Sequence, residues 1–211
     1  MQDTTDDTTD RPYHHGDLRR VIIDTAMDML QERGGWRFTL RELARRAGVS
    51  HAAPYKHFPD KAALLTELAL IGFDRLRETL IATTHPAATP VREQLVAAAR
   101  AYVGFAMANP ALYRLMFGAD AGKPADVHLN ERALGAFGVL LEMLERGQDA
   151  GALRKRPIRG QAAACWAQIH GAAMLTIDGL LLPEKVGPDA LEAALATLFE
   201  GLETREDEPR P

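Results

Sequence analysis

The segment VSHAAPYKHFPDK, residues 49–61, gathers side chains that suit binding to a nucleic acid. Imidazole, phenol and ammonium groups donate hydrogen bonds to phosphate oxygens or to base edges. The segment offers His51, Tyr55, Lys56, His57 and Lys61. Ala52 has no bulk, so a helix carrying it can approach base edges or touch a thymine methyl group. The Ser50 hydroxyl and the amides after it suit a phosphate. The cluster predicts a DNA-contacting surface, with a solvated face of an ordinary helical protein as the alternative.

Two other groupings resemble reactive or metal sites, but neither predicts an enzyme. Cys165 and His170 would make a nucleophile and its base, yet five residues of α-helix turn them about 140° apart. His14, His15 and Asp17 offer metal ligands without a fourth partner, and we expect the two histidines, with Arg11 and Tyr13, near DNA instead. The chain has no phosphate loop, no HExxH and no nucleophile elbow. We therefore expect no catalysis, no cofactor and no metal.

Composition describes a globular protein with one basic part. Hydrophobic residues make up 46% and charged residues 26% of the 211 residues, and the net charge is −4. Residues 11–61 nevertheless hold ten Lys and Arg against six Asp and Glu, whereas the rest of the chain is acidic. This asymmetry favours a nucleic-acid-binding N-terminal part. One cysteine and an N-terminus unlike a signal peptide predict a cytoplasmic protein.

The stretch GQAAACWAQIHGAAMLTI, residues 160–177, carries no Asp, Glu, Lys or Arg and is near the shortest length of a membrane span. It contains two glutamines, a histidine and two glycines, and Asp178 follows. We therefore expect a helix buried by protein on most sides, and no membrane partner.

Local signals place the cluster of residues 49–61 in a helix-turn-helix. Thr39 and Glu42 have capping-box spacing, and Phe38 and Leu43 have the spacing of a hydrophobic staple. Gly48 allows the left-handed conformation that ends this short helix. A second short helix then follows, and a longer one starts near residue 61, which is the organisation of a helix-turn-helix.

Pro54 lies inside the expected second helix. With Ser50 as the N-cap, Pro54 is the fourth helical residue, and its missing N–H would have bonded only the Ser50 carbonyl. The steric clash also falls on Ser50, whose non-helical dihedrals relieve it, so we expect little cost. Pro54 should then pack inward, leaving an outward face of His51, Ala52, Tyr55 and Lys56, with His57 near its edge.

Helical patterns continue to the C-terminus, so the expected fold class is all-α. A first helix runs from about residue 18 to the glycine pair 34–35. Further helices are expected over 61–81, 91–108, 111–117, 127–151, 159–182 and 188–203. No strand pattern and no internal repeat stand out.

The sequence from residue 16 to residue 65 resembles the DNA-binding domain of TetR-family transcriptional regulators. The resemblance rests on Thr39, Leu43, Ala44, Gly48, Val49, Ser50, Tyr55, Phe58, Lys61, Leu64 and Leu65. Pro54 replaces a residue that is usually leucine-like in the family. NPALYRLMFG and WAQIHG are similar to a subgroup whose C-terminal domain is named for its Trp-His-Gly (WHG) residues. Those positions would be Trp166, His170 and Gly171.

The resemblance implies an all-helical homodimer with a three-helix DNA-binding domain on a palindromic operator, usually repressing transcription. Its C-terminal domains would dimerise and hold a small-molecule effector. Positions that often contact DNA in the family match Ser50, His51, Ala52, Tyr55, Lys56, His57 and Lys61. Thr39 matches a helix cap that often touches phosphate.

Two expectations concern the C-terminal part, and each has an alternative. An apolar ligand cavity would be lined by Tyr102, Phe105, Met116, Phe117, Trp166, His170 and Met174. His170 would be a polar ligand contact or a group that changes charge near neutral pH, or else a hydrogen-bonded core histidine beside a packing tryptophan. Helices 159–182 and Leu191–Leu202 would form a four-helix dimer interface, or their apolar stripes would be intrachain core.

These expectations give the following domain order. An acidic, disordered tail covers 1–12, a helix-turn-helix domain covers 13–60, an effector and dimerisation domain covers 61–204, and a flexible tail covers 205–211. The leading hypothesis is a DNA-binding repressor released by a small molecule. The alternatives are a helical carrier or enzyme-like binding protein with an incidental helix-turn-helix, and a protein-interaction module that uses the basic face.

Overall fold

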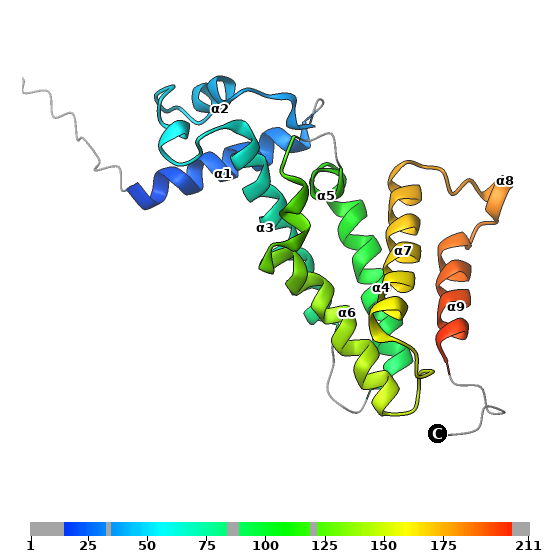
Figure 1. The fold of residues 1–211 in the computed structure, drawn as a ribbon. Coiled ribbons are helices and arrows are strands. Elements are labelled where there is room, and N and C mark those ends of the chain that lie inside the picture. Colours follow the sequence, from blue (N-terminus) through cyan, green and yellow to red (C-terminus); the bar gives the residue numbers. More distant parts are fainter. Residues whose placement is uncertain (1–14, 33–34, 84–88, 119–121, 204–211) are drawn as a thin grey trace, which may run out of the picture. The chain divides into compact units, whose positions relative to one another are not determined.

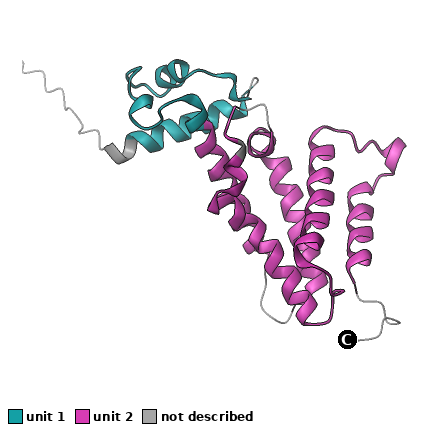
Figure 2. Cartoon of the chain, in the orientation of Figure 1, with its two compact units in different colours: residues 1–64 teal, residues 65–211 magenta. Residues whose placement is uncertain are grey.

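The structure, a computed structural model, describes residues 15–32, 35–83, 89–118 and 122–203. Packing divides the chain into two compact units, residues 1–64 and 65–211 (Figure 1, Figure 2). The expected tails over 1–12 and 205–211 lie outside the described residues, as does His14. The domain boundary expected after residue 60 coincides with the start of α3 (Lys61–Ile81), and the division between the units falls inside that helix.

The first unit is a small helical domain with a glycine turn. It consists of α1 (His15–Gln31), the 3₁₀ turn η1 (Gly35–Arg37), α2 (Leu40–Arg46), the 3₁₀ turn η2 (Pro54–Lys56) and the first residues of α3. Apolar side chains from each of these helices make its core: Ile22, Ala26, Leu30, Leu43, Ala44, Phe58 and Leu64. Gly48 turns the chain after α2 with φ of +67°, a conformation that favours glycine, as the sequence predicted.

The capping box that begins α2 is present. The Thr39 side chain accepts a hydrogen bond from the Glu42 amide at 3.2 Å, and the Glu42 carboxylate accepts one from the Thr39 amide at 2.7 Å. Hydrogen bonds from the backbone and side chain of Thr39 hold the pKa of Glu42 below its usual value. The carboxylate therefore contributes stability above the ordinary pKa of a glutamate and loses it as the pH falls. Phe38 and Leu43, the staple pair, are both buried.

Replacing Thr39 by alanine should weaken the start of α2. We expect the free energy of unfolding of the first unit to fall by about 1 kcal/mol, the usual cost of losing an N-cap side chain. The deficit should shrink as the pH falls through the lowered pKa of Glu42, because the protonated carboxyl no longer strengthens the capping box. The measurement is urea unfolding followed by Trp36 fluorescence in a Trp166→Phe background, because these are the two tryptophans of the chain.

Thr79→Ala is the matched control for this experiment. Thr79 lies in α3 and donates its hydroxyl to the Arg75 carbonyl at 2.8 Å, so it caps no helix start. Equal losses from the two variants would show that the cap of α2 has no special role.

The segment around Pro54 differs from the predicted α-helix. Residues 51–53 form a turn in which the Ala53 amide donates to the Ser50 carbonyl at 2.9 Å, and Pro54 is the first residue of η2 rather than the fourth of a longer helix. The reason is the missing proline N–H, which cannot close an α-turn onto the Ser50 carbonyl. A proline at the first helical position costs little. The inward packing of Pro54 was correctly predicted, because it is buried.

The second unit is a helical bundle. Its helices are the rest of α3, α4 (Val91–Ala108), α5 (Pro110–Phe117), α6 (Glu131–Asp149), α7 (Ile158–Ile177) and α9 (Ala190–Leu202), with the 3₁₀ turn η4 (Ala125–Leu129) and the short α8 (Pro183–Val186) (Figure 1). α7 packs on α4, α6 and α9. Gln168 fastens α9 to α7 by donating to the Ala194 carbonyl at 2.7 Å.

Two helix ends in the second unit differ from the prediction. The helix expected from residue 127 begins at Glu131, because the Asn130 side chain caps it by accepting from the Arg132 amide at 3.0 Å. The helix expected to reach residue 182 ends at Ile177, and Gly179 then adopts φ of +66°. The end of α4 at Asn109-Pro110 matches the prediction.

Within the single chain, the uncharged helix α7 is buried on one side only, and the expected burial of its other side by protein stays a prediction. Its buried side chains are Gln161, Ala162, Cys165, Ile169, Ala172 and Ala173. Gly160, Ala164, Ala167 and Leu175 share the opposite face and are exposed in the single chain. The reason is the composition of the helix, because alanine and glycine give one face no bulk with which to fill a core.

Within the described residues, no single helix is long and apolar enough to cross a membrane. α4 and α5 pass that test only when taken together, and they are bent by 105° at the break between them.

Candidate functional site

The first unit exposes the side chains that the sequence assigned to DNA. Ser50, His51, Ala52, Tyr55 and Lys56 are exposed, whereas Ala53 and Pro54 between them are buried. Because Ala53 and Pro54 are buried, they fix the turn against the core, and Ala52 and Tyr55 on either side of them face outward. The predicted outward face is therefore present, and Tyr55, with 52% of its surface exposed, is its largest side chain. Contact of these residues with DNA stays a prediction.

The remaining residues of the predicted DNA set are His57, Lys61 and Thr39. His57 is half-buried, and its Nε2 atom is buried without a hydrogen-bond partner among the described residues. The Lys61 ammonium lies 5.6 Å from the centroid of the Phe38 ring. Burial lowers the pKa of Lys61, and the negative charge of Glu42 offsets only part of this effect. Thr39 is exposed and caps α2. The sequence prediction did not include Arg41 and Arg45, which α2 also exposes.

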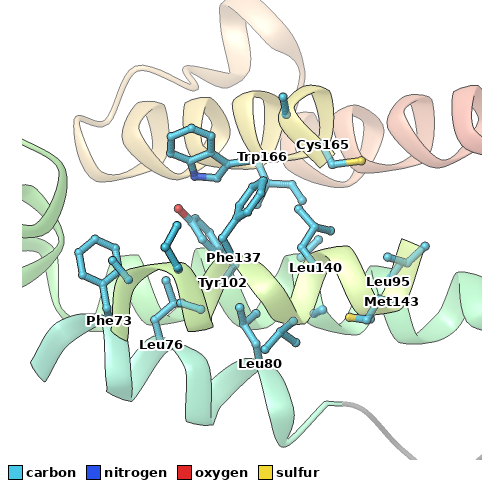
Figure 3. Close-up of a pocket in the computed structure, with 18 of the residues that line it drawn as sticks. Phe73, Leu76, Leu80, Leu95, Tyr102, Phe137, Leu140, Met143, Cys165 and Trp166 are labelled. Carbon is cyan, nitrogen blue, oxygen red and sulfur yellow. The ribbon is translucent and has the colours of Figure 1, made fainter. Parts of the chain in front are cut away.

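The second unit contains a cavity of about 320 Å³ that is partly open to solvent (Figure 3). Apolar side chains of α3, α4, α6 and α7 make most of its wall, among them Phe73, Leu76, Leu80, Leu95, Phe137, Leu140 and Met143. Tyr102, Phe117 and Trp166 of the predicted ligand set line it as well. The wall also contains His128 of η4 and Cys165. Burial raises the pKa of the Cys165 thiol to about 11, so this cysteine stays protonated near neutral pH.

The other predicted ligand residues do not line this cavity. Phe105 and Met116 are buried in the core, and Met174 is half-buried on α7. Met116 packs so closely on Gly72 of α3 that a Cβ atom there would lie 2.6 Å from its sulfur atom. His170 is half-buried and does not line the cavity, but it contacts Tyr102, which does.

A hydrogen-bonded cluster of three side chains borders the cavity: Tyr102 and Tyr113 of α4 and α5, and His170 of α7. The Tyr113 hydroxyl lies 2.6 Å from His170 Nδ1 and 3.0 Å from the Tyr102 hydroxyl. The Tyr102 hydroxyl lies 3.5 Å from His170 Nδ1. The Tyr113 and His170 rings are stacked with centroids 5.5 Å apart. This bonding matches the alternative in which His170 is a hydrogen-bonded core histidine.

Burial keeps this cluster uncharged near neutral pH. It raises the pKa of Tyr102 and of Tyr113, and it lowers the pKa of His170, which the nearby His128 lowers further. The pKa of His128 is itself lowered by burial and by Lys123. The sequence prediction missed Tyr113, although NPALYRLMF places it three residues from Met116, which was included.

Comparisons with known proteins match both units. Residues 22–68 match the family described as bacterial regulatory proteins, tetR family, and residues 95–199 match the tetracyclin repressor-like C-terminal domain. The tetracycline repressor protein class C of Escherichia coli is 30% identical over 212 residues, covering 88% of this chain and 90% of that protein. The chain belongs to the TetR family.

Two further relatives of this TetR-family regulator cover most of its length. The HTH-type transcriptional regulator BetI of Rhizobium meliloti is 29% identical, over 84% of each chain. A solved structure of a protein with unknown function from Rhodococcus sp. RHA1 is 37% identical, with a TM-score of 0.78, covering 92% of this chain and all of that one. The predicted all-α fold with an N-terminal helix-turn-helix is thus confirmed, and the chain is a DNA-binding regulator of transcription.

Proposed function

We propose that this TetR-family regulator is a homodimeric repressor that binds a palindromic operator and releases it when a small molecule occupies the cavity of the second unit. One observation supports the proposal above the others. The helix α3 carries Lys61 at the end of the DNA-binding unit and Phe73, Leu76 and Leu80 in the cavity wall. A ligand that prefers one position of this helix would shift the population of operator-binding molecules.

The DNA-binding part of the proposal rests on the exposed face around Tyr55 and Lys56. Tyr55, Lys56 and Lys61 would donate to backbone phosphates, and Ser50 would hold a phosphate with the amides that follow it. His51 and Ala52 would reach base edges in the major groove. His57 and Thr39 would contact the backbone at the border of this face. The regulator would act in the cytoplasm, on the DNA there.

The homodimer would form on the outward face of α7, with help from the outward face of α9. Gly160, Ala164, Ala167 and Gly171 give α7 a surface that allows close approach of a second helix, and a Cβ atom at either glycine would meet nothing within 4 Å in the chain. A two-fold dimer would bring the same face of both copies together.

The leucine stripe of α9 does not belong to this interface. Leu195, Leu198 and Leu202 are buried inside the chain. This burial matches the alternative in which the apolar stripe of this helix is part of the intrachain core. Only the other side of α9, with Ala193, Thr197 and Gly201, remains exposed for a partner.

The C-terminal domain would belong to the subgroup named for Trp-His-Gly. Trp166 lies in the cavity wall, and His170 bonds the tyrosines behind it. Gly171 follows His170 in α7 and lies on the proposed dimer face. These three residues would thus link the ligand cavity to the dimer contact.

Selection of bound sequences from a random DNA pool tests the proposed function. We expect an enriched palindrome, whose affinity falls steeply as the salt concentration rises, because bound lysines and arginines release counterions from the phosphates. Two recognition segments in successive major grooves require half-sites about 34–36 Å apart or more widely spaced. A carrier or an interaction module would enrich no sequence and would bind DNA only weakly at low salt.

A further inference from the structure

We infer that the molecule that binds the cavity of the second unit is uncharged and largely apolar, has the bulk of about two rings, and carries one hydrogen-bond acceptor such as a ketone oxygen. The inference rests on the proposed function, because it names the class of effector for the same cavity. It is argued from the volume of the cavity, the charge of its wall and the hydrogen bonds at its polar end.

The volume of the cavity sets the size of the ligand. An apolar protein cavity of about 150 Å³ holds benzene. The cavity here is about 320 Å³, roughly twice that volume, so it has room for two fused or linked rings. Phenyl rings and leucine side chains on opposite walls would contact both faces of such a molecule.

The wall of the cavity excludes a charged ligand. Of the described residues that line it, none is Asp, Glu, Lys or Arg. Its ionisable side chains are neutral near pH 7, because burial raises the pKa of Tyr102 and of Cys165 and lowers that of His128. A buried carboxylate or ammonium would find no opposite charge there, and its lost hydration would go uncompensated.

Polar groups gather at one end of the cavity. In Figure 3 the Tyr102 hydroxyl and the Trp166 indole nitrogen face one another at the same end, whereas Leu80, Leu95 and Met143 form the other end. A ligand with one polar group would therefore bind with that group beside Tyr102 and its hydrocarbon part toward Met143.

The hydrogen bonds of Tyr102 determine which polar group fits. The Tyr102 oxygen lies 3.0 Å from the Tyr113 hydroxyl, and it shares the polar end of the cavity with the Trp166 indole nitrogen, which can only donate. In one proton arrangement, His170 donates from Nδ1 to Tyr113 and Tyr113 donates to Tyr102, so the Tyr102 oxygen already accepts a hydrogen bond within the cluster. The Tyr102 hydrogen then needs an acceptor, because His170 Nδ1, 3.5 Å away, already carries a hydrogen.

The alternative proton arrangement needs no ligand. There Tyr102 donates to Tyr113, and Tyr113 donates to an unprotonated His170 Nδ1 at 2.6 Å. Both arrangements are neutral and differ only in the histidine tautomer and the two hydroxyl rotations. A carbonyl or ether oxygen in the cavity would select the first arrangement, and an apolar ligand would leave the second in place. The cluster thus distinguishes an acceptor-bearing ligand from a hydrocarbon of the same shape.

Three probes of matched shape test the inference by equilibrium dialysis against the full chain: 2-acetylnaphthalene, 2-ethylnaphthalene and 2-naphthoate. We expect 2-acetylnaphthalene to bind about tenfold more tightly than 2-ethylnaphthalene, the gain from roughly one net hydrogen bond. We expect 2-naphthoate at pH 7.5 to bind at least about 100-fold more weakly than the ketone. Comparable binding of the carboxylate and the ketone, or no binding of either neutral probe, would overturn the inference.

Substitutions assign the effect to the polar end. Tyr102→Phe should remove the tenfold advantage of the ketone and leave the binding of 2-ethylnaphthalene within about twofold. Tyr55→Phe, the same substitution on the exposed face of the first unit, should change neither. Ala98→Leu, in the cavity wall, should weaken both neutral probes at least about tenfold by reducing the free volume. An undiminished advantage of the ketone in Tyr102→Phe contradicts the inference.

Operator binding, measured separately on the selected DNA, distinguishes this inference from the proposed function. If the ketone binds with the expected pattern and operator affinity does not change, the ligand class stands and release of the operator is wrong. If the palindrome binds and no neutral probe does, the ligand class is wrong and DNA recognition stands.

Discussion

Replacing Tyr55 and Lys56 together by alanine is expected to lower operator affinity at least 100-fold while leaving the cavity of the second unit intact. Both side chains are exposed on the segment that Ala53 and Pro54 anchor. A dimer would lose about four hydrogen bonds of about 1 kcal/mol each, because each half-site loses two. The measurement is a titration of the selected palindrome at fixed salt, with 2-acetylnaphthalene binding as the test of an intact second unit.

The salt dependence separates the contribution of Lys56 from that of Tyr55. Lys56→Ala alone should reduce the slope of log affinity against log salt by about 2, because one phosphate contact is lost in each half-site. Tyr55→Phe should weaken binding without changing that slope. Lys185→Ala, which removes an exposed lysine from α8, is the control and should change neither quantity. Full operator affinity in the double variant would show that Tyr55 and Lys56 do not make the main DNA contact. Other exposed residues, for example Arg41 and Arg45 of α2, would then have to make it.

The exposed face that we propose to bind DNA was predictable from the sequence because local chemistry determines it. The Thr39–Glu42 capping box, the left-handed Gly48 and the buried Pro54 each depend on residues within a few positions. These signals fix the turn and hence the residues that face outward. The length of the second helix was not predictable in the same way. Pro54 was correctly judged to be tolerable, but its missing N–H replaced the α-helix by a turn and a 3₁₀ turn.

The cavity of the second unit was only partly predictable, because it depends on contacts between distant segments. Tyr102, Phe117 and Trp166 were found from their size and aromatic character. The leucines of α3 and α6 were missed, since an apolar stripe has the same sequence pattern whether it fills a core or lines a cavity. The pairing of Tyr113 with His170 joins residues 57 positions apart, which no spacing rule in the sequence indicates.

The two sides of α7 show the same limit. An uncharged segment predicted burial, but it did not tell whether this chain or a second copy would cover each side. One side of α7 packs against α4, α6 and α9, and Ala164 and Ala167 are exposed on the other side. An experiment must therefore determine whether a second copy of the chain covers the outward side of α7.

Ala167→Arg is expected to convert the proposed dimer into a monomer and to abolish binding to the full palindrome. A two-fold interface would place both copies of the arginine against the same surface, so each charge would be buried without a partner and close to a like charge. A monomer holds a single half-site and loses the combined contacts of both recognition segments. Sedimentation velocity of the free protein and a titration with palindromic DNA measure the two effects.

Ala108→Arg is the matched control, because Ala108 is exposed at the end of α4, outside the proposed interface. It should stay dimeric and bind the operator normally. The Ala167→Arg monomer should still bind 2-acetylnaphthalene, because Ala167 does not line the cavity, and that result would exclude general unfolding. A dimeric Ala167→Arg protein with normal operator affinity would show that α7 is not the contact between the two copies. The paired chains would then have to meet through another surface, and the proposed link from the cavity through Gly171 to the dimer contact would fail with it.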